Sequence, residues 1–145
     1  MSKFVYKFRS IQKVKEVLQK KVQKEIALID MEIENFKNEY SRVSEEKMES
    51  KRNFNQKDVS IGEIKFRKNY ELCLDRKMVV ILENIEKLNK KKEIKLLELV
   101  QKSKEQKIFD SLEEVYHDNF NKEQNRSELK FIDELATQKY VRQTK

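Results

Sequence analysis

Side chains that commonly carry chemistry are scarce in this sequence. His117 is the only histidine and Cys73 is the only cysteine. Metal sites and activated nucleophiles need several such groups at matched spacing. The sequence offers no paired metal ligands, no phosphate-binding glycine loop and no nucleophile beside a base. We interpret His117 as a solvated residue on a polar stretch and Cys73 as a reduced residue of an apolar seam. The sequence therefore predicts a protein that is not an enzyme, without catalytic residues, cofactor or metal.

Charged side chains make up 41% of the residues, and the net charge of +7 is concentrated at one end of the chain. Residues 1–24 contain eight bases and one acid, so the rest of the chain is neutral overall. A basic helix start is poorly placed against the helix dipole, whose N-terminal end favours acids. It would suit an acidic protein partner, an anionic membrane surface or nucleic acid, although a solvated helix start explains it equally well.

A lysine-rich run, Asn89-Lys90-Lys91-Lys92, could also contact phosphates. The sequence shows no recognition helix, zinc site or aromatic platform beside it, so we do not expect nucleic acid as a partner. No stretch approaches the about 18 apolar residues of a membrane span. Lysine and arginine also break up the N-terminal apolar residues that a secretory signal would need. We therefore expect a cytoplasmic protein.

The elements that position these residues are predicted by the spacing of apolar side chains. With one Gly and no Pro, almost nothing interrupts helices. We expect a first helix over about residues 3–52, capped by Ser2. Its apolar residues recur every three or four positions and so form one narrow seam, which a single helix cannot bury alone. The seam comprises Phe4, Phe8, Ile11, Val14, Leu18, Val22, Ile26, Ile29, Ile33, Phe36, Tyr40 and Val43.

A polar connection over about residues 53–60 separates this helix from a second one over about 61–140. Ser60 followed three residues later by Glu63 fits a capping box that starts the second helix. A short connection between long helices predicts an antiparallel hairpin. The predicted fold class is all-α: an antiparallel two-helix coiled-coil hairpin with a longer, overhanging C-terminal helix, in which residues 1–145 form a single unit. The second seam comprises Tyr70, Leu74, Met78, Ile81, Ile85, Leu88, Leu96 and Leu99.

The register of the hairpin follows from the position of the turn, which we place near residues 56–58. This register pairs Val22 with Lys92, and it places Phe4 opposite about residue 110. Residues 111–145 then have no partner in the chain and overhang as a helix that is marginal by itself. Both seams take two successive four-residue steps, and this shared stutter supports the register. The steps are Leu18–Val22–Ile26 in the first helix and Leu88–Lys92–Leu96 in the second.

Two stretches of the sequence carry distinctive motifs. They are Lys3-Phe4-x-Tyr6-Lys7-Phe8-Arg9-x-Ile11-Gln12-x-Val14 at the start and Asn125-Arg126-x-x-x-Lys130-x-x-Asp133-Glu134-x-Ala136 at the end. The first resembles the opening of FliJ proteins, the small coiled-coil component of the flagellar type III export apparatus. The second resembles their C-terminal signature, a charged run that leads into Asp-Glu-hydrophobic-Ala. The length and the two-helix layout agree, so the resemblance covers the whole chain.

The resemblance implies a coiled coil similar to the central stalk, the gamma subunit, of rotary ATP synthases. It implies that the protein binds and stimulates a hexameric, FliI-like export ATPase and links it to an FlhA-like export gate. It also implies that the protein escorts export chaperones. Such a protein serves flagellum biogenesis, motility and chemotaxis. It would associate peripherally with the cytoplasmic face of the inner membrane at the flagellar base, with membrane contact only through the export apparatus.

The resemblance also suggests where these partners bind. The coiled coil nearer the hairpin turn would contact the export gate. Its residues also fit plain seam positions, and Tyr40 and Tyr70, whose polar tips lie at the edge of the seam, are the better candidates for a partner. The ATPase-contacting end would comprise Phe4, Phe8, Arg9, Arg126, Lys130, Asp133 and Glu134. The gate-contacting residues would be Phe36, Tyr40, Val43, Tyr70 and Leu74.

Three other classes of function remain open from the sequence. A generic dimeric coiled-coil scaffold would use the overhang to pair with a second copy and would not affect an ATPase. A stalk of the related type III injectisome would share the architecture, although the two terminal motifs favour the flagellar apparatus. A binder of nucleic acid or anionic membrane would use the basic start of the chain and would lose binding steeply with salt.

Overall fold

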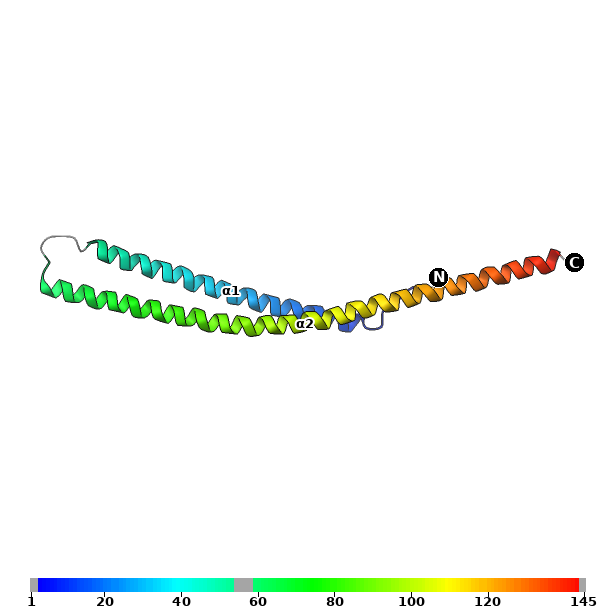
Figure 1. Ribbon diagram of the computed structural model, residues 1–145, viewed down its shortest axis with the longest axis horizontal. Coiled ribbons are helices and arrows are strands. Elements are labelled where there is room, and N and C mark those ends of the chain that lie inside the picture. The colour runs from blue at the N-terminus through cyan, green and yellow to red at the C-terminus, as the bar shows by residue number, and fades with distance from the viewer. Residues whose placement is uncertain (1–2, 54–58, 144–145) are drawn as a thin grey trace. The chain divides into compact units, whose positions relative to one another are not determined.

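The computed structural model describes residues 3–53 and 59–143, and this part of the chain contains two α-helices (Figure 1). Helix α1 spans Arg9–Arg52, and helix α2 spans Ile61–Gln143. The two helices pack antiparallel, which confirms the predicted all-α hairpin with a longer second helix. α1 has 44 residues and α2 has 83. The predicted cap Ser2 and residues 54–58 of the predicted connection lie outside the described residues.

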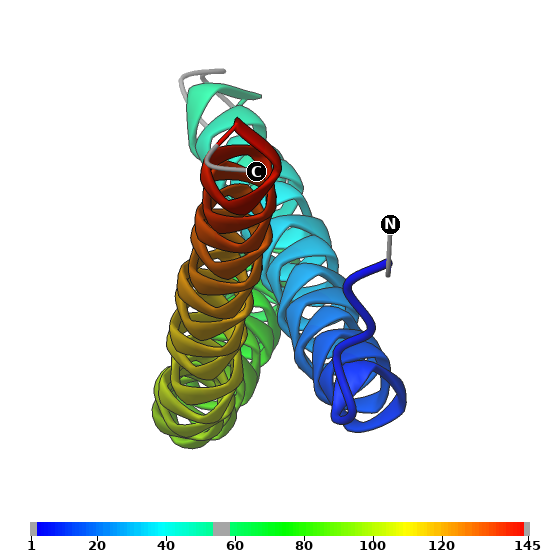
Figure 2. The same ribbon diagram turned by 90° about the vertical axis from the view of Figure 1, so that its right-hand side faces the viewer.

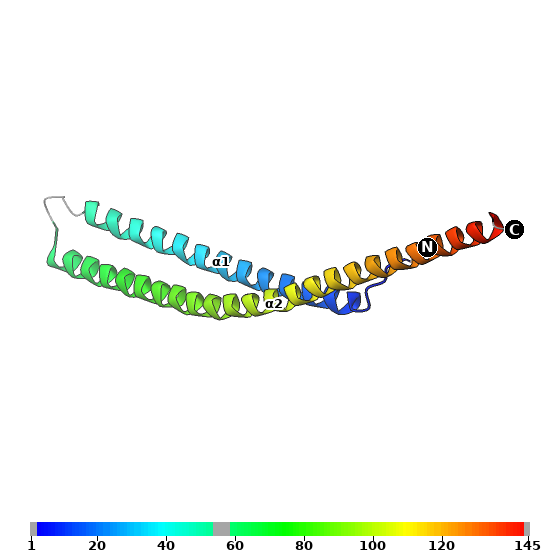
Figure 3. The ribbon, with the colours of Figure 1, turned by 45° about the vertical axis from the view of Figure 1, so that its right-hand side comes forward.

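Two compact units divide the chain, and each contains parts of both helices. We call Lys20–Val100 the middle unit, and we call Met1–Gln19 with Gln101–Lys145 the terminal unit. α1 and α2 run side by side through the middle unit (Figure 3). No helix within the described ranges combines the length and apolar character needed to cross a membrane.

The core of the middle unit is a seam of apolar side chains between the helices. α1 contributes residues three and four positions apart, the spacing of a coiled-coil heptad. On α2, Leu74 and Ile81 are buried, and Val43 of α1 joins them in one cluster against which several half-buried side chains pack. Removal of this surface from water stabilises the pair by about 25 cal/mol for each Å² of apolar area. The buried residues of α1 are Val22, Ile26, Ile29, Ile33 and Val43.

Ion pairs flank this seam and set its register. Glu25 pairs with Lys95 at 2.7 Å, Glu39 with Lys77 at 3.7 Å, and Lys47 with Asp75. The predicted register is wrong in detail, because Lys92 does not lie opposite Val22. Its ammonium group pairs at 2.6 Å with Asp30, which lies two turns farther along α1. The observed register therefore gives Lys92 an acidic partner, whereas the predicted register placed it against the apolar side chain of Val22.

The predicted stutter is also absent, because the heptad spacing of α1 continues without a break through polar residues. Gln12, Lys15 and Gln19 are half-buried and bond to α2, whereas the predicted seam residues Ile11, Val14 and Leu18 are exposed. On α2 the same phase leaves Lys92 and Lys95 half-buried and Leu96 exposed. An unbroken alternation of three and four keeps one face toward the partner helix, and the polar residues on this face find charged partners.

The start of α1 differs from the prediction as well. The helix begins at Arg9 rather than near residue 3, and the residues before it are not helical. Figure 2 shows this segment in blue where it leads into α1. The first helical hydrogen bond runs from the amide of Gln12 to the carbonyl of Phe8, at 2.9 Å. The six residues 3–8, which we call the N-terminal segment, instead pack their aromatic rings against α2.

The start of α2 follows the sequence signal. The amide of Ser60 donates to the carboxylate of Glu63 at 3.1 Å, and the amide of Glu63 donates to the Ser60 hydroxyl at 3.3 Å. These reciprocal bonds form a capping box, which satisfies amides that have no partner inside the helix. The predicted start of the second helix is thus supported by both of its expected contacts.

Candidate functional site

An aromatic cluster joins the N-terminal segment to α2 in the terminal unit. The Phe4 ring lies edge-on to His117, with centroids 5.1 Å apart, and tilted against Phe120 at 5.6 Å. The Phe8 ring packs on Tyr116 at 6.2 Å and on Phe109 at 6.5 Å. Such offset and edge-on ring pairs contribute beyond their buried area, by about 0.5–1.5 kcal/mol each. The aromatic cluster comprises Phe4, Tyr6, Phe8, Phe109, Tyr116, His117 and Phe120.

Tyr6 is the buried centre of this cluster. Its side chain is 4% exposed, and its hydroxyl donates to the main-chain carbonyl of Phe109 at 3.0 Å. Its ring also packs on Phe8 and on Tyr116. Burial, and then the neighbouring carboxylate of Glu113, raise the pKa of the phenol, so the hydroxyl stays protonated and able to donate. The sequence did not identify Tyr6 as a buried residue. A helix that runs through residue 6, as we predicted, places Tyr6 outside the apolar seam.

His117 contacts the N-terminal segment, which the sequence did not suggest. It is exposed, as expected, but its ring forms the edge-on contact with Phe4, and its Nδ1 lies 3.2 Å from the Asn121 side-chain amide. The correct heptad phase would have predicted that this part of α2 faces the start of the chain. Counting forward from the buried Leu74 in steps of four and three places Phe109, Tyr116 and Phe120 on the inward face of α2.

The predicted overhang begins later than expected. Phe4 was placed opposite about residue 110, but it contacts His117 and Phe120. The register of the helix pair accounts for this difference, because Gln12 bonds to Asp110 and Glu113, which lie more than two turns beyond the position that the predicted register placed opposite it. Residues 111–120 therefore have a partner. We call residues 125–142, each of which is exposed, the exposed segment of α2.

Four residues of the predicted ATPase-contacting end lie in this exposed segment. Arg126, Lys130, Asp133 and Glu134 are all exposed, and their spacing of four, three and one places them along one side of the helix. Apolar side chains accompany them, and Ile132 and Leu129 are more than half exposed. Both the aromatic cluster, with Phe4 and Phe8, and the exposed segment belong to the terminal unit.

Arg9, the remaining residue of this predicted end, is exposed at the first position of α1. Its backbone amide donates to the Tyr6 carbonyl at 3.3 Å, in the turn that leads from the N-terminal segment into α1. No acidic residue lies in the first turn of α1, so the positive charge of Arg9 faces the positive end of the helix dipole without local compensation.

Polar contacts hold the rest of α1 against α2 within the terminal unit. The Gln12 side-chain amide donates to Asp110 at 2.7 Å and to Glu113 at 2.9 Å. Lys15 pairs with Glu105 at 2.6 Å, and this bond lowers the pKa of the Glu105 carboxyl. Because apolar burial here is small, this interface depends on charge and on the aromatic cluster that closes it.

The predicted gate-contacting residues lie in the middle unit. Phe36, Tyr40 and Tyr70 are half-buried and pack against the core, where Val43 is 2% exposed and Leu74 is buried. The Tyr70 hydroxyl donates to Glu46, and this bond raises the pKa of the phenol. A partner could touch the edges of the three half-buried rings, but it could reach Val43 and Leu74 only if the helices separated.

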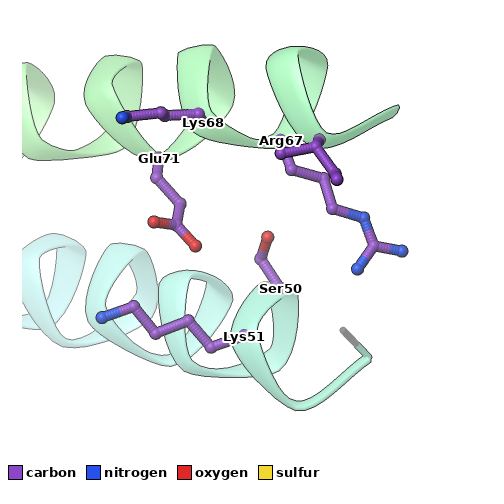
Figure 4. Close-up of a pocket in the computed structure, with 6 residues that line it drawn as sticks. Ser50, Lys51, Arg67, Lys68 and Glu71 are labelled. Atoms are coloured by element: carbon purple, nitrogen blue, oxygen red, sulfur yellow. The ribbon is translucent and has the colours of Figure 1, made fainter. Parts of the chain in front are cut away.

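Two shallow grooves show what the remaining surface could bind. One lies where α1 ends and α2 begins, and Figure 4 shows Ser50 and Glu71 reaching from opposite helices while Lys51 and Lys68 lie along their own helices. The other lies beside Phe4 and His117, and four carboxylates line it: Asp110, Glu113, Glu114 and Asp118. Neither holds an arrangement for catalysis.

Metal-ligating residues do not gather anywhere in residues 3–53 and 59–143, since no group of three or more His, Cys, Asp or Glu side chains is placed to hold an ion. Cys73 is exposed rather than part of the seam, because it precedes the inward Leu74 and so faces outward. It is a free thiol.

Comparison with known proteins gives one family. No curated protein and no solved structure matches the chain. The profile of the family described as "Flagellar FliJ protein" matches residues 4–145, which include the N-terminal segment, both helices and the exposed segment. The chain therefore belongs to the family of flagellar FliJ proteins, which are non-enzymatic components of the flagellar protein export apparatus.

Proposed function

We propose that this protein binds the hexameric export ATPase through its terminal unit and stimulates ATP hydrolysis, as a central stalk does in a rotary ATPase. The observation that carries the proposal is the exposed segment of α2. Its residues 125–142 are all exposed and present charged and apolar side chains together. A lone helix of this length is marginal in water, so a partner that covers it would stabilise it.

The charged residues of this segment give the contact its specificity. Arg126 and Lys130 are one turn apart, and Asp133 and Glu134 follow, so a ring of subunits would meet both signs of charge. Phe4 and Phe8 flank the segment from the aromatic cluster, and Arg9 adds a positive charge at the start of α1.

The test compares ATP hydrolysis by the purified export ATPase alone, with the full chain, and with a chain that ends at Gln124. This truncation keeps every ring of the aromatic cluster and removes only the exposed segment and the residues after it. We expect stimulation by the full chain and at least a five-fold weaker effect of the truncated one. Equal stimulation would move the contact out of the exposed segment, and no stimulation by either would refute the stalk role.

A double variant locates the contact more finely. Arg126→Ala with Lys130→Ala should weaken stimulation. The matched control is Lys87→Ala with Lys91→Ala, which removes two exposed bases at the same spacing from α2 in the middle unit. If both double variants weaken stimulation equally, general positive charge acts rather than this site. Sedimentation of the full chain alone tests the rival scaffold, which predicts a concentration-dependent dimer and no effect on the ATPase.

We further propose that the middle unit contacts the membrane export gate, and that the protein thereby links ATPase and gate and escorts export chaperones at the cytoplasmic face of the inner membrane. Tyr40 and Tyr70 are the side chains best placed for this, because each is only half-buried and ends in a hydroxyl. Tyr40→Ala should weaken capture by the cytoplasmic part of the gate protein without lowering ATPase stimulation. Unchanged capture by this variant and by Tyr70→Phe would refute the assignment.

A further inference from the structure

In the terminal unit, polar residues of α1 face α2, and apolar side chains are therefore left exposed on the outside of the helix pair. Gln12, Lys15 and Gln19 face α2, so Ile11, Val14 and Leu18, each one position earlier, face away; Val14 is 57% exposed. α2 repeats the pattern around its own inward residues Phe109, Glu113 and Tyr116. Ile108 is 65% exposed, Val115 is also exposed, and the two line a shallow groove with Leu112.

These two sets of side chains lie on the same side of the helix pair. The residue before an inward position is rotated by about 100° around its helix, because a turn takes about 3.6 residues. The two helices run in opposite directions, so this rotation carries both sets toward one flank rather than to opposite flanks. We call the two sets together the apolar strip. It consists of Ile11, Val14, Leu18, Ile108, Leu112 and Val115.

Basic side chains border the exposed apolar residues of α2. Lys107 lines the groove with Ile108, and Lys104 is exposed one turn before Ile108. Glu105 lies on this side as well, and its carboxylate is paired with the Lys15 ammonium at 2.6 Å. The acidic groove beside Phe4 shares no lining residue with the groove of Ile108. Residues 1–24 add a net charge of +7.

We propose that the apolar strip binds directly to an anionic lipid surface. A flank of two helices offers a shallow apolar surface rather than a deep groove, and a bilayer interface takes such a surface with the apolar side chains below the headgroups. The lysine stems extend along the apolar region while their ammonium groups reach lipid phosphates. This contact is separate from the proposed ATPase contact, and its test uses no other protein.

The first experiment is flotation of the full chain with vesicles of phosphatidylcholine alone or mixed with phosphatidylglycerol. We expect at least ten-fold stronger binding to the anionic vesicles and weakening with salt. The strip variant, Ile11→Ser with Val14→Ser and Ile108→Ser, should lose roughly ten-fold of this binding, since three exposed side chains no longer enter the interface. The control, Leu28→Ser with Met31→Ser and Leu97→Ser, removes three exposed apolar side chains of the middle unit and should bind as the unaltered chain does.

A second measurement keeps the test decisive if the strip variant folds poorly. The chain has no tryptophan, so Val14→Trp and Leu28→Trp each introduce a single probe. With anionic vesicles the fluorescence of the first should shift to the blue, and that of the second should not. Equal binding to both kinds of vesicle, an equal shift of both probes, or binding that the strip variant retains would overturn the proposal. So would a dimer, without vesicle binding, that the strip variant abolishes, because the occupant would then be a second copy.

Discussion

The hydroxyl of Tyr6 donates a hydrogen bond to the main-chain carbonyl of Phe109 at 3.0 Å, and this bond ties the N-terminal segment to the middle of α2. Next to it, α1 meets α2 through Gln12, Lys15 and Gln19 rather than through apolar side chains. The aromatic cluster therefore closes an interface that is otherwise polar.

Substitution of Tyr6 should loosen this end of α1. Tyr6→Phe removes only the hydroxyl, and Tyr6→Ala removes the ring as well. Amide exchange over residues 12–19 should accelerate roughly five-fold in the first variant, the effect of one hydrogen bond, and by far more in the second. Hydrogen exchange with mass spectrometry measures both.

The control for Tyr6 is Val5→Ala, which truncates a 79% exposed neighbour and should leave exchange unchanged. Exchange over residues 26–43 in the middle unit should not respond to any of the three substitutions. Equal exchange rates over residues 12–19 in all variants would mean that the polar contacts alone hold this part of α1.

The capping box at Ser60 predicts a pair of opposite stability changes. Ser60→Ala removes the hydroxyl that accepts the Glu63 amide and should lower the free energy of unfolding by about 1 kcal/mol. Gly62→Ala should raise it by about 0.5 kcal/mol, because the added Cβ would meet no atom closer than the Ser60 hydroxyl at 3.8 Å. Urea unfolding followed by circular dichroism measures both, and a destabilised Gly62→Ala variant would contradict the assigned helical conformation.

The sequence was informative about elements because their signals are local. Residues 60–63 carry a complete capping box, and the apolar spacing from Val22 to Val43 matches the side chains that are buried. These features predicted two antiparallel helices and the start of the second one. The family resemblance rested on the motif of residues 3–14 and on the charged motif of residues 125–136, whose side chains are exposed.

The phase of the seam could not be read from hydrophobicity alone. Ile11 and Val14 are the apolar residues on the first turns of α1, so hydrophobicity assigns them to the seam. The heptad positions that face α2 are instead Gln12 and Lys15. Those polar residues are stabilised by Asp110, Glu113 and Glu105, nearly a hundred positions away. Long-range charge partners of this kind leave no periodic signal. The non-helical conformation of the N-terminal segment was not predicted for the same reason, since only its contacts with α2 distinguish the segment from a helix.

The core of the middle unit should respond strongly to truncation. Ile81 is 3% exposed and packs in the cluster with Val43 and Leu74. Ile81→Ala should lower the free energy of unfolding by about 3 kcal/mol, through lost burial and the cavity that remains. Val80→Ala truncates the exposed side chain of the preceding residue and should change the free energy of unfolding by less than about 0.5 kcal/mol. Similar effects of the two substitutions in urea unfolding would contradict the assigned inward face of α2.

Stability should fall at both extremes of pH, for reasons that one ion pair can test. Hydrogen bonding to Lys95 lowers the pKa of Glu25, and hydrogen bonding to Glu25 raises the pKa of Lys95. A lowered carboxyl pKa contributes stability above the unfolded value of about 4.3, and this is lost as the pH falls through the folded pKa. A raised lysine pKa contributes below about pH 10.4 and is lost as the pH rises through the folded pKa.

Replacement of Lys95, the partner of Glu25, should weaken the dependence of stability on pH. In Lys95→Met the Glu25 carboxyl has lost the largest cause of its lowered pKa, so the melting temperature should decline less between pH 5 and pH 2 than in the unaltered chain. The control Lys87→Met removes an exposed lysine from the same helix and should keep the full decline. Thermal unfolding by circular dichroism across this range distinguishes them, and identical slopes in all three proteins would assign the acid sensitivity to other carboxylates.

The polar seam of the terminal unit should be less stable than an apolar one would be. Gln19 is half-buried on the inward face and donates to the Ser103 hydroxyl at 3.0 Å. Gln19→Ile exchanges this bond for apolar burial at a heptad position and should raise the free energy of unfolding by about 1 kcal/mol. Gln23→Ile places the same side chain on the exposed side of α1 and should not. If Gln19→Ile also weakens ATPase stimulation, the polar seam is retained because the terminal unit must open at this interface. If stimulation is unchanged, the polar side chain at position 19 serves only the pairing of α1 with α2.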